Sequence, residues 1–227
     1  MQKISEAIIM NDTARNKTLR LTVTAMLCAL AFLAVAVCRI PVVMFLKYEP
    51  KDVVVTLGGF MFGPLVSLVI SVVVSLIEMV TISETGFIGF IMNVISTCSF
   101  ACVAALIYKK KKSTVGAAAG LAVGGLVMVA AMLLWNYLIS PLYMGVSRAQ
   151  VAAMLIPAFL PFNLIKAGLN CALTFVIYKP LAAGLGKAGL IQVHEDINKK
   201  TPAVFFVIAG AVVVVCVFAV LHFNDII

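Results

Sequence analysis

IPVVMFLKYEPKDVVVTLGGFMFGP, residues 40 to 64, decides the fold, because it is too apolar for a hydrophilic loop and too interrupted for a single helix. Pro41 and Pro50 each remove a backbone donor and disfavour helical geometry at the preceding residue. Five polar side chains fall within six residues, namely Lys47, Tyr48, Glu49, Lys51 and Asp52. Non-helical backbone is tolerated at membrane depth only where it packs on protein or lines a cavity. We therefore expect residues 40 to 52 to form a lid loop over a pocket.

The composition places the chain among polytopic helical membrane proteins. Of its 227 residues, 63% are hydrophobic and 11% are charged, and the mean hydropathy is +1.16. Its apolar runs exceed the length of soluble core helices. The 17 Lys and Arg residues outnumber the 9 Asp and Glu residues, but most lie in short segments between apolar runs, which favours control of topology over nucleic-acid binding. We predict an all-α fold surrounded by lipid, with no nucleic-acid partner.

Seven apolar stretches predict the membrane-spanning helices. They cover residues 19–38, 53–63, 65–81, 87–108, 116–139, 156–178 and 203–222. The second is short for a hydrocarbon core about 30 Å thick, so we expect it to borrow length from the loop before it. Twelve of the seventeen Lys and Arg residues fall on one side of this arrangement, which the positive-inside rule makes cytoplasmic. The lid, a turn at 83–86 and a loop over 140–155 are then external.

This topology divides the chain into four parts. Residues 1–18 form a cytoplasmic N-terminal segment, and 19–180 form a six-helix membrane domain that includes the external lid loop 40–52. Residues 181–202 form a cytoplasmic linker, and 203–227 form an extra C-terminal transmembrane helix. No signal-peptide cleavage pattern precedes the first span, so we expect that span to stay in the mature protein.

Polar side chains gather near the external ends of the predicted spans. They are Glu78, Asn93, Asn136, Asn163 and Lys166, and Asn163, Lys166 and Asn170 also share one helical stripe because they are spaced i, i+3, i+7. Ionisable residues in a membrane are costly and usually functional, although a lysine near a helix end can also snorkel to the interface. Amide and ammonium groups suit the edge of a planar heterocycle with carbonyls and ring nitrogens. An uncharged or weakly anionic aromatic ligand would fit.

Aromatic side chains near the same ends would cover the faces of such a ring or form an interfacial belt. They are Phe45, Tyr48, Trp135, Tyr137, Phe159 and Phe162. Glu78 either pairs with Lys166 or binds a ligand hydroxyl, and the sequence leaves both open.

Small residues indicate where helices touch. Gly116, Gly120 and Gly124 recur at every fourth position of the fifth span, which favours close packing inside the protein. Ala25 and Ala29 lie one turn apart on the first helix and suit either internal packing or a separate subunit. The sequence lacks a P-loop and known catalytic motifs, and all six cysteines lie in apolar runs. We therefore expect no enzyme activity, no catalytic residue, no cofactor and no metal site.

Several separated motifs carry a resemblance to a known family. They are FLKYEPKD (45–52), GGFMFGP (58–64), WNYLISPLYMG (135–145), PFNLIKAGLN (161–170) and the pair Tyr178-Lys179. Over residues 19 to 179 the chain resembles the riboflavin-specific substrate-binding (S) components of energy-coupling factor (ECF) transporters of the bacterial plasma membrane. The extra C-terminal helix departs from the six-helix core of that family.

The resemblance implies that this chain captures riboflavin with high affinity from outside, with the lid loop closing over the vitamin. It further implies that Asn136, Asn163 and Lys166 bond the isoalloxazine ring. The resemblance also implies that an AxxxA motif at Ala25 and Ala29 contacts the transmembrane coupling subunit and that two separate cytoplasmic ATPase subunits supply the energy.

We predict a substrate site made of Phe45, Tyr48, Glu78, Asn93, Asn136, Asn163, Lys166 and Asn170. Two alternatives stay open. The first is an S component for another vitamin, such as thiamine or pantothenate, and the second is a membrane enzyme or assembly scaffold with no transported solute.

Overall fold

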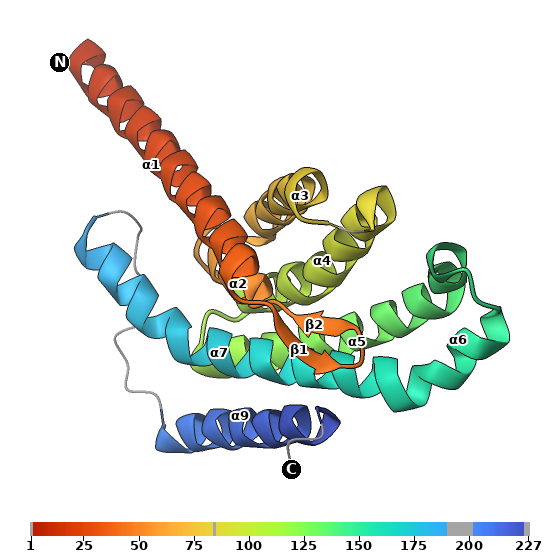
Figure 1. Ribbon diagram of the computed structural model, residues 1–227. Coiled ribbons are helices and arrows are strands. Elements are labelled where there is room, and N and C mark those ends of the chain that lie inside the picture. The colour runs from red at the N-terminus through yellow and green to blue at the C-terminus, as the bar shows by residue number, and fades with distance from the viewer. Residues whose placement is uncertain (1, 84, 190–201, 225–227) are drawn as a thin grey trace.

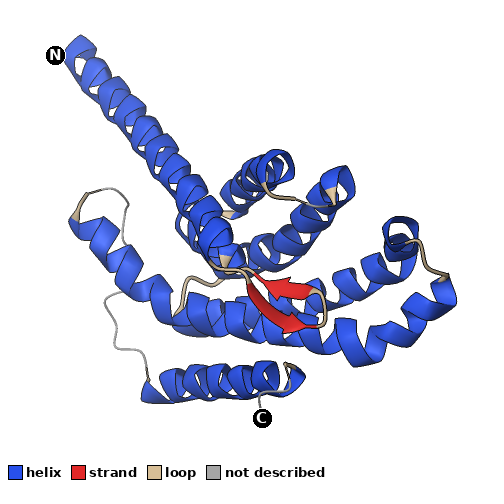
Figure 2. Ribbon diagram, viewed as in Figure 1, coloured by secondary structure: helices blue, strands red, loops and turns tan. Residues whose placement is uncertain are grey.

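The computed structural model describes residues 2–83, 85–189 and 202–224, with side chains from Lys17 onward. Apart from one hairpin, every regular element in this part of the chain is helical (Figures 1 and 2). In order the elements are α1 (Gln2–Val37), β1 (Ile40–Val43), β2 (Leu46–Tyr48), α2 (Lys51–Phe62), α3 (Pro64–Thr81), α4 (Gly86–Lys110), α5 (Thr114–Met144), α6 (Arg148–Met154), the π-helical turn η1 (Leu155–Phe159), α7 (Leu160–Lys187) and α9 (Ala203–Phe223). The predicted all-α membrane fold is confirmed.

Six helical stretches in the described residues are long and apolar enough to cross a membrane. They are Lys17–Val37, Pro64–Thr81, Gly86–Lys110, Thr114–Met144, Arg148–Lys187 and Ala203–Phe223. The second predicted stretch is α2, whose 12 residues extend only about 18 Å at 1.5 Å per residue. It begins at Lys51, two residues earlier than predicted. Nine of its residues are buried, so α2 is a central element enclosed by longer helices.

Glycines set the closest helix contacts. A Cβ atom added at Gly120 or Gly124 of α5 would lie 2.7 Å from the Ala104 carbonyl oxygen or 2.6 Å from the Phe100 carbonyl oxygen of α4. The two backbones are therefore in near contact, as the glycine repeat predicts. Apolar residues of α2, α4, α5 and α7 form the largest core cluster around this contact.

The predicted lid is an antiparallel hairpin, which was expected only as a non-helical loop. Ile40 pairs with Tyr48 and Pro41 with Lys47, and a bulge separates Pro41 from the next pair. Because the hairpin ends at Tyr48 and α2 begins at Lys51, the lid is shorter than residues 40 to 52. Lys51 and Asp52 are buried helix residues, and their assignment to an external loop was wrong.

The external loop predicted over 140–155 was also wrong. Helix α5 continues through Pro141 to Met144, and α6 begins at Arg148 after a capping box made by Ser147 and Gln150. Pro141 lies in the last turn of α5, and its missing N–H removes one backbone bond from the helix. Only residues 145–147 lack helical structure here. The predicted sixth span is part of one helical run that extends to Lys187.

The C-terminal helix α9 lies alongside α7 (Figure 1). Cys216 packs against the backbone of α7, with its Sγ 3.8 Å from the carbonyl oxygen of Ile165. Beyond the end of α9, the Asn224 amide donates to the carbonyl oxygens of Pro41 at 3.3 Å and Val42 at 3.4 Å. The extra helix therefore touches the hairpin. The predicted linker over 181–202 begins too early, because residues 181–187 belong to α7. Its residues 190–201 lie outside the described residues.

Candidate ligand-binding cavity

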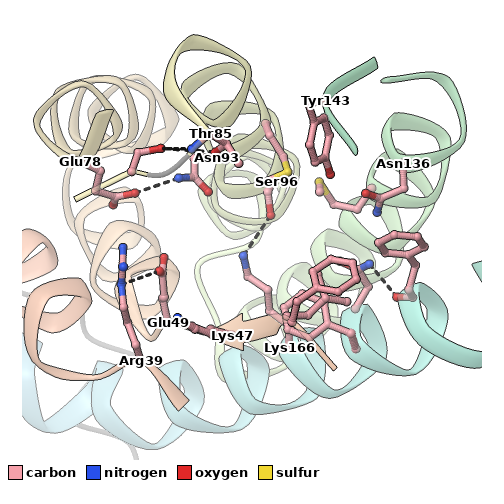
Figure 3. Close-up of a pocket in the computed structure, with 18 of the residues that line it drawn as sticks. Arg39, Lys47, Glu49, Glu78, Thr85, Asn93, Ser96, Asn136, Tyr143 and Lys166 are labelled. Carbon is pink, nitrogen blue, oxygen red and sulfur yellow. Dashed lines mark hydrogen bonds and ion pairs between the residues drawn. The ribbon is translucent and has the colours of Figure 1, made fainter. Parts of the chain in front are cut away.

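A cavity of about 250 Å³ opens between the hairpin and helices α3, α4, α5 and α7 (Figure 3). Its apolar lining consists of Phe45, Leu46, Ile82, Met92, Met132, Phe159 and Phe162. Its polar lining consists of Arg39, Lys47, Glu49, Glu78, Ser83, Thr85, Asn93, Ser96, Asn136, Tyr143, Asn163 and Lys166. Aromatic faces combined with convergent polar groups are typical of sites for organic ligands, and here the polar groups outnumber the apolar ones.

Two asparagines from α5 and α7 line one side of the cavity. Asn136 is nearly buried, and its Oδ1 accepts a hydrogen bond from Ser140 Oγ at 2.9 Å. Within the described part of the chain no group accepts from its Nδ2, which leaves a donor for a ligand. Asn163 leaves an acceptor instead of a donor. Its Nδ2 donates to the Phe159 carbonyl oxygen at 2.7 Å, so its Oδ1 remains for a ligand.

Lys166 lies one turn beyond Asn163 on α7, with its ammonium group in the cavity wall. It donates to Ser96 Oγ at 3.1 Å and forms an ion pair with Asp52 Oδ2, also at 3.1 Å. An ammonium group has three donors, so one remains for a ligand. The cavity thus presents a donor, an acceptor and a donor from Asn136, Asn163 and Lys166.

Carboxylate and basic groups line the side of the cavity opposite Asn136 (Figure 3). Glu78 accepts from Lys51 through both oxygens, at 2.7 and 2.6 Å, and from Asn93 Nδ2 at 2.8 Å. Glu49 pairs with Arg39 Nε at 3.2 Å. The partner of Glu78 is therefore Lys51 and not Lys166, which settles a pairing that the sequence left open.

The structure brings six of the eight predicted substrate residues to the cavity wall. These are Phe45, Glu78, Asn93, Asn136, Asn163 and Lys166. Tyr48 and Asn170 lie outside the wall and bond each other, with Tyr48 donating to Asn170 Oδ1 at 2.9 Å. Burial, followed by the Asp52 charge, raises the pKa of the Tyr48 phenol, so its hydroxyl stays protonated and donates. Ala25 and Ala29 lie on an exposed face of α1, away from the cavity.

Of the six aromatic residues singled out in the sequence, three reach the cavity. Phe45, Phe159 and Phe162 line it, and Phe45 meets Phe159 edge to face with ring centroids 6.3 Å apart. Tyr137 faces outward beneath the Arg148 guanidinium, 5.6 Å from its ring centre. The three lining rings provide apolar surface for a flat ligand.

Sequence reasoning missed the buried pair Lys51 and Asp52. It placed both residues in the external lid loop, whereas Asp52 is fully buried in α2. A signal for this was present, because Pro50 followed by an acidic residue in the next turn is typical of a helix start. Reading the helix from Lys51 would have placed both charges inside the protein.

Comparison with known proteins identifies a family, a relative and a solved structure that this chain resembles. Residues 19–178 match the family model of the ECF transporter, substrate-specific component. The chain is 30% identical over 173 residues to the riboflavin transporter RibU of Staphylococcus aureus (strain TCH60), covering 72% of this chain and 90% of that protein. A solved S component of a bacterial ECF transporter superposes with a TM-score of 0.63 at 28% identity, covering 74% of this chain and 98% of that one. Helix α9 lies beyond the family match.

Proposed function

The chain belongs to the substrate-specific components of the ECF transporters, and we propose that the vitamin it captures is riboflavin. The observation that carries this proposal is the row of hydrogen-bonding groups formed by Asn136, Asn163 and Lys166. The pyrimidine edge of the isoalloxazine ring presents a carbonyl oxygen, an imide N–H and a second carbonyl oxygen. These acceptor, donor and acceptor groups complement the donor, acceptor and donor of the cavity.

The remaining lining fits the rest of the vitamin. Phe159, Phe162 and Phe45 cover the flat ring, and the hydroxyls of the ribityl chain bond Glu78 and Asn93 on the opposite side of the cavity. Hydrogen bonds to charged groups contribute more than neutral ones in a dry site. The similarity to the riboflavin transporter of Staphylococcus aureus supports the same ligand.

The alternatives fit the geometry less well. Thiamine carries a positive charge that would face the Lys166 ammonium, and pantothenate has no planar imide edge to pair with Asn163. A scaffold without a solute would have no use for this lined cavity, and the family model that the chain matches describes a transporter component, which favours capture over catalysis.

Capture is one step of uptake, and energy comes from other chains. We propose that the N-terminus is cytoplasmic in the plasma membrane of a bacterium, so that the hairpin and the cavity face the exterior. Ala25 and Ala29 then lie on the surface that meets the transmembrane coupling subunit, and two cytoplasmic ATPase subunits drive release of the vitamin.

Titration of the purified protein in detergent tests this function. We expect riboflavin fluorescence to be quenched with one-to-one stoichiometry, and we expect neither thiamine nor pantothenate to compete. Riboflavin methylated at the imide nitrogen should bind far more weakly, because the methyl group removes the donor for Asn163. Absence of riboflavin binding, or displacement of riboflavin by either other vitamin, would disprove the assignment.

A further inference from the structure

We propose that Lys51 and Asp52, adjacent residues in the first turn of α2, are positioning residues for the two charged side chains of the binding site. Asp52 orients Lys166 and Lys51 orients Glu78, each from the side away from the cavity. This inference rests on the proposed function and assigns roles to two residues that do not line the cavity themselves.

Asp52 is fully buried, and both of its carboxylate oxygens are occupied. Oδ1 accepts from Thr97 Oγ1 at 2.6 Å, and Oδ2 accepts from Asn170 Nδ2 and Lys166 Nζ, each at 3.1 Å. Together with Ser96 on α4, Asp52 uses two of the three ammonium donors of Lys166. The direction of the third donor is thereby fixed toward the ligand.

Lys51 holds Glu78 by a comparable arrangement. Lys51 is 2% exposed, its Nζ donates to both carboxylate oxygens of Glu78, and its other contact is the more distant Glu49 at 3.9 Å. A carboxylate has about four acceptor sites, and Lys51 and Asn93 occupy three. The remaining acceptor of Glu78 faces the cavity and is suited to a ribityl hydroxyl.

Because Lys51 and Asp52 are adjacent in the sequence, one helical turn can contact both Glu78 and Lys166. Successive helical residues point about 100° apart, so Lys51 reaches α3 while Asp52 reaches α4 and α7. A buried charge without a partner is costly. Pairing each binding charge with an opposite charge on α2 offsets part of the cost of burying it.

The same turn also connects the site to the hairpin. Tyr48, the last residue of β2, donates to Asn170, and Asn170 donates to Asp52. A side-chain path of three hydrogen-bonded or ion-paired contacts thus leads from the hairpin to Lys166. Ordering of the hairpin and ordering of the binding lysine depend on the same carboxylate.

Affinity measurements with two flavins separate positioning from a general effect on the fold. Lumiflavin carries the isoalloxazine ring but has a methyl group in place of the ribityl chain. We expect Asp52→Asn to weaken riboflavin and lumiflavin about tenfold each, because both need Lys166. We expect Lys51→Met to weaken riboflavin about tenfold and to leave lumiflavin within about twofold, since only riboflavin has hydroxyls for Glu78.

Double-mutant cycles supply the second readout. Asp52→Asn should cause no further loss when added to Lys166→Met, and Lys51→Met should cause none when added to Glu78→Gln. Each double variant removes both charges of a pair, so no unpaired charge is left to prevent folding. Thr97→Val is a milder variant that removes one bond to Asp52, and we expect about threefold weaker binding of both flavins only while Lys166 is present.

Two results would overturn the inference. Additive losses in both cycles, or equal losses of the two flavins in Lys51→Met, would mean that these residues only stabilise the fold. If the unmodified protein bound no riboflavin, the proposed function would fail and this inference with it. Normal binding by the unmodified protein combined with additive cycles would reject the positioning roles alone.

Discussion

Asn136 is the residue whose removal tests the amide side of the cavity most directly. Its side chain is 4% exposed, and Ser140 fixes the amide so that Nδ2 is left for a ligand. In Asn136→Ala a carbonyl oxygen of the bound flavin would lose its donor in a dry site, at a cost of more than about 1 kcal/mol. Isothermal titration with riboflavin should therefore show at least about fivefold weaker binding.

The neighbouring Tyr137 gives a matched control for this variant. Its ring faces outward under Arg148, so Tyr137→Phe should bind riboflavin as the unmodified protein does. Equal affinities for Asn136→Ala and Tyr137→Phe would show that the amide does not contact the vitamin.

At this scale the sequence predicted the cavity residues better than their partners. The i, i+3 spacing of Asn163 and Lys166 is a local property of one helix, and both reach the cavity. The pairing of Lys51 with Glu78 depends on where α2 begins and how it packs on α3. The charged residues beside Pro50 are typical of a water-exposed loop. For that reason the burial of Asp52 was not predicted.

Among the elements, α9 is the one whose removal should affect the hairpin. Val42 and Val43 of β1 are buried in an apolar cluster with Cys216 of α9, and Asn224 bonds two hairpin carbonyl groups. The Asn224 amide has two donor hydrogens, and one of them bonds the Val220 carbonyl oxygen at 2.8 Å. The two hairpin contacts therefore share the other hydrogen, and Asn224→Ala removes the equivalent of one hydrogen bond, roughly 0.5–1.5 kcal/mol. Deletion of residues 203–227 also exposes the valines. We expect riboflavin to dissociate faster, by about two- to tenfold for Asn224→Ala.

Hydrogen exchange of the amides of residues 40–48 would locate this effect. Exchange should accelerate in Asn224→Ala and accelerate further in the deletion. Val207→Ala is the control, because Val207 is 69% exposed on the same helix and its truncation should leave hairpin exchange unchanged. Unaltered exchange in the deletion variant would show that α9 does not support the hairpin.

The contact between α4 and α5 predicts that the same glycine-to-alanine substitution has different effects on stability at two positions. A Cβ at Gly124 would meet the Phe100 carbonyl oxygen at 2.6 Å, so Gly124→Ala must separate two helices and should cost about 1–3 kcal/mol. Gly184→Ala meets no heavy atom within 4 Å and should be neutral or stabilising by roughly 0.5–1 kcal/mol. Thermal unfolding in detergent compares them, and a Gly124→Ala variant as stable as Gly184→Ala would contradict the packing.

Hydropathy predicted the helix boundaries closely for long lipid-facing helices and less well where a helix continues beyond its apolar run. The long apolar runs gave α3, α4 and α9 within a few residues. The end of α5 was placed too early because Pro141 and the polar residues after it are typical of loops, whereas a capping box at Ser147 and the π-turn at η1 continue the helical path. The capping box of Ser147 and Gln150 is a local signal that could have been read from the sequence, whereas the π-turn depends on tertiary packing, which local patterns do not encode.

At the scale of the whole molecule, the proposed function gives capture and energy supply to separate chains, and we expect the exposed face of α1 to be where those chains meet. Ala25 and Ala29 are exposed there beside Met26 and Leu30, which are 60% and 50% exposed. Small residues let another helix approach closely. Neither alanine lines the cavity, so a bulky substitution should block docking of the coupling subunit without altering riboflavin affinity.

Ala29→Trp tests that separation in cells that supply the coupling and ATPase subunits but lack their own riboflavin uptake. We expect the purified variant to bind riboflavin within about twofold of the unmodified protein and the cells to lose accumulation of labelled riboflavin. Val207→Trp adds the same bulk to α9, beyond the family match, and should transport normally. Transport by Ala29→Trp at the normal rate would place the coupling contact elsewhere, because a tryptophan cannot fit where two helices meet through alanine.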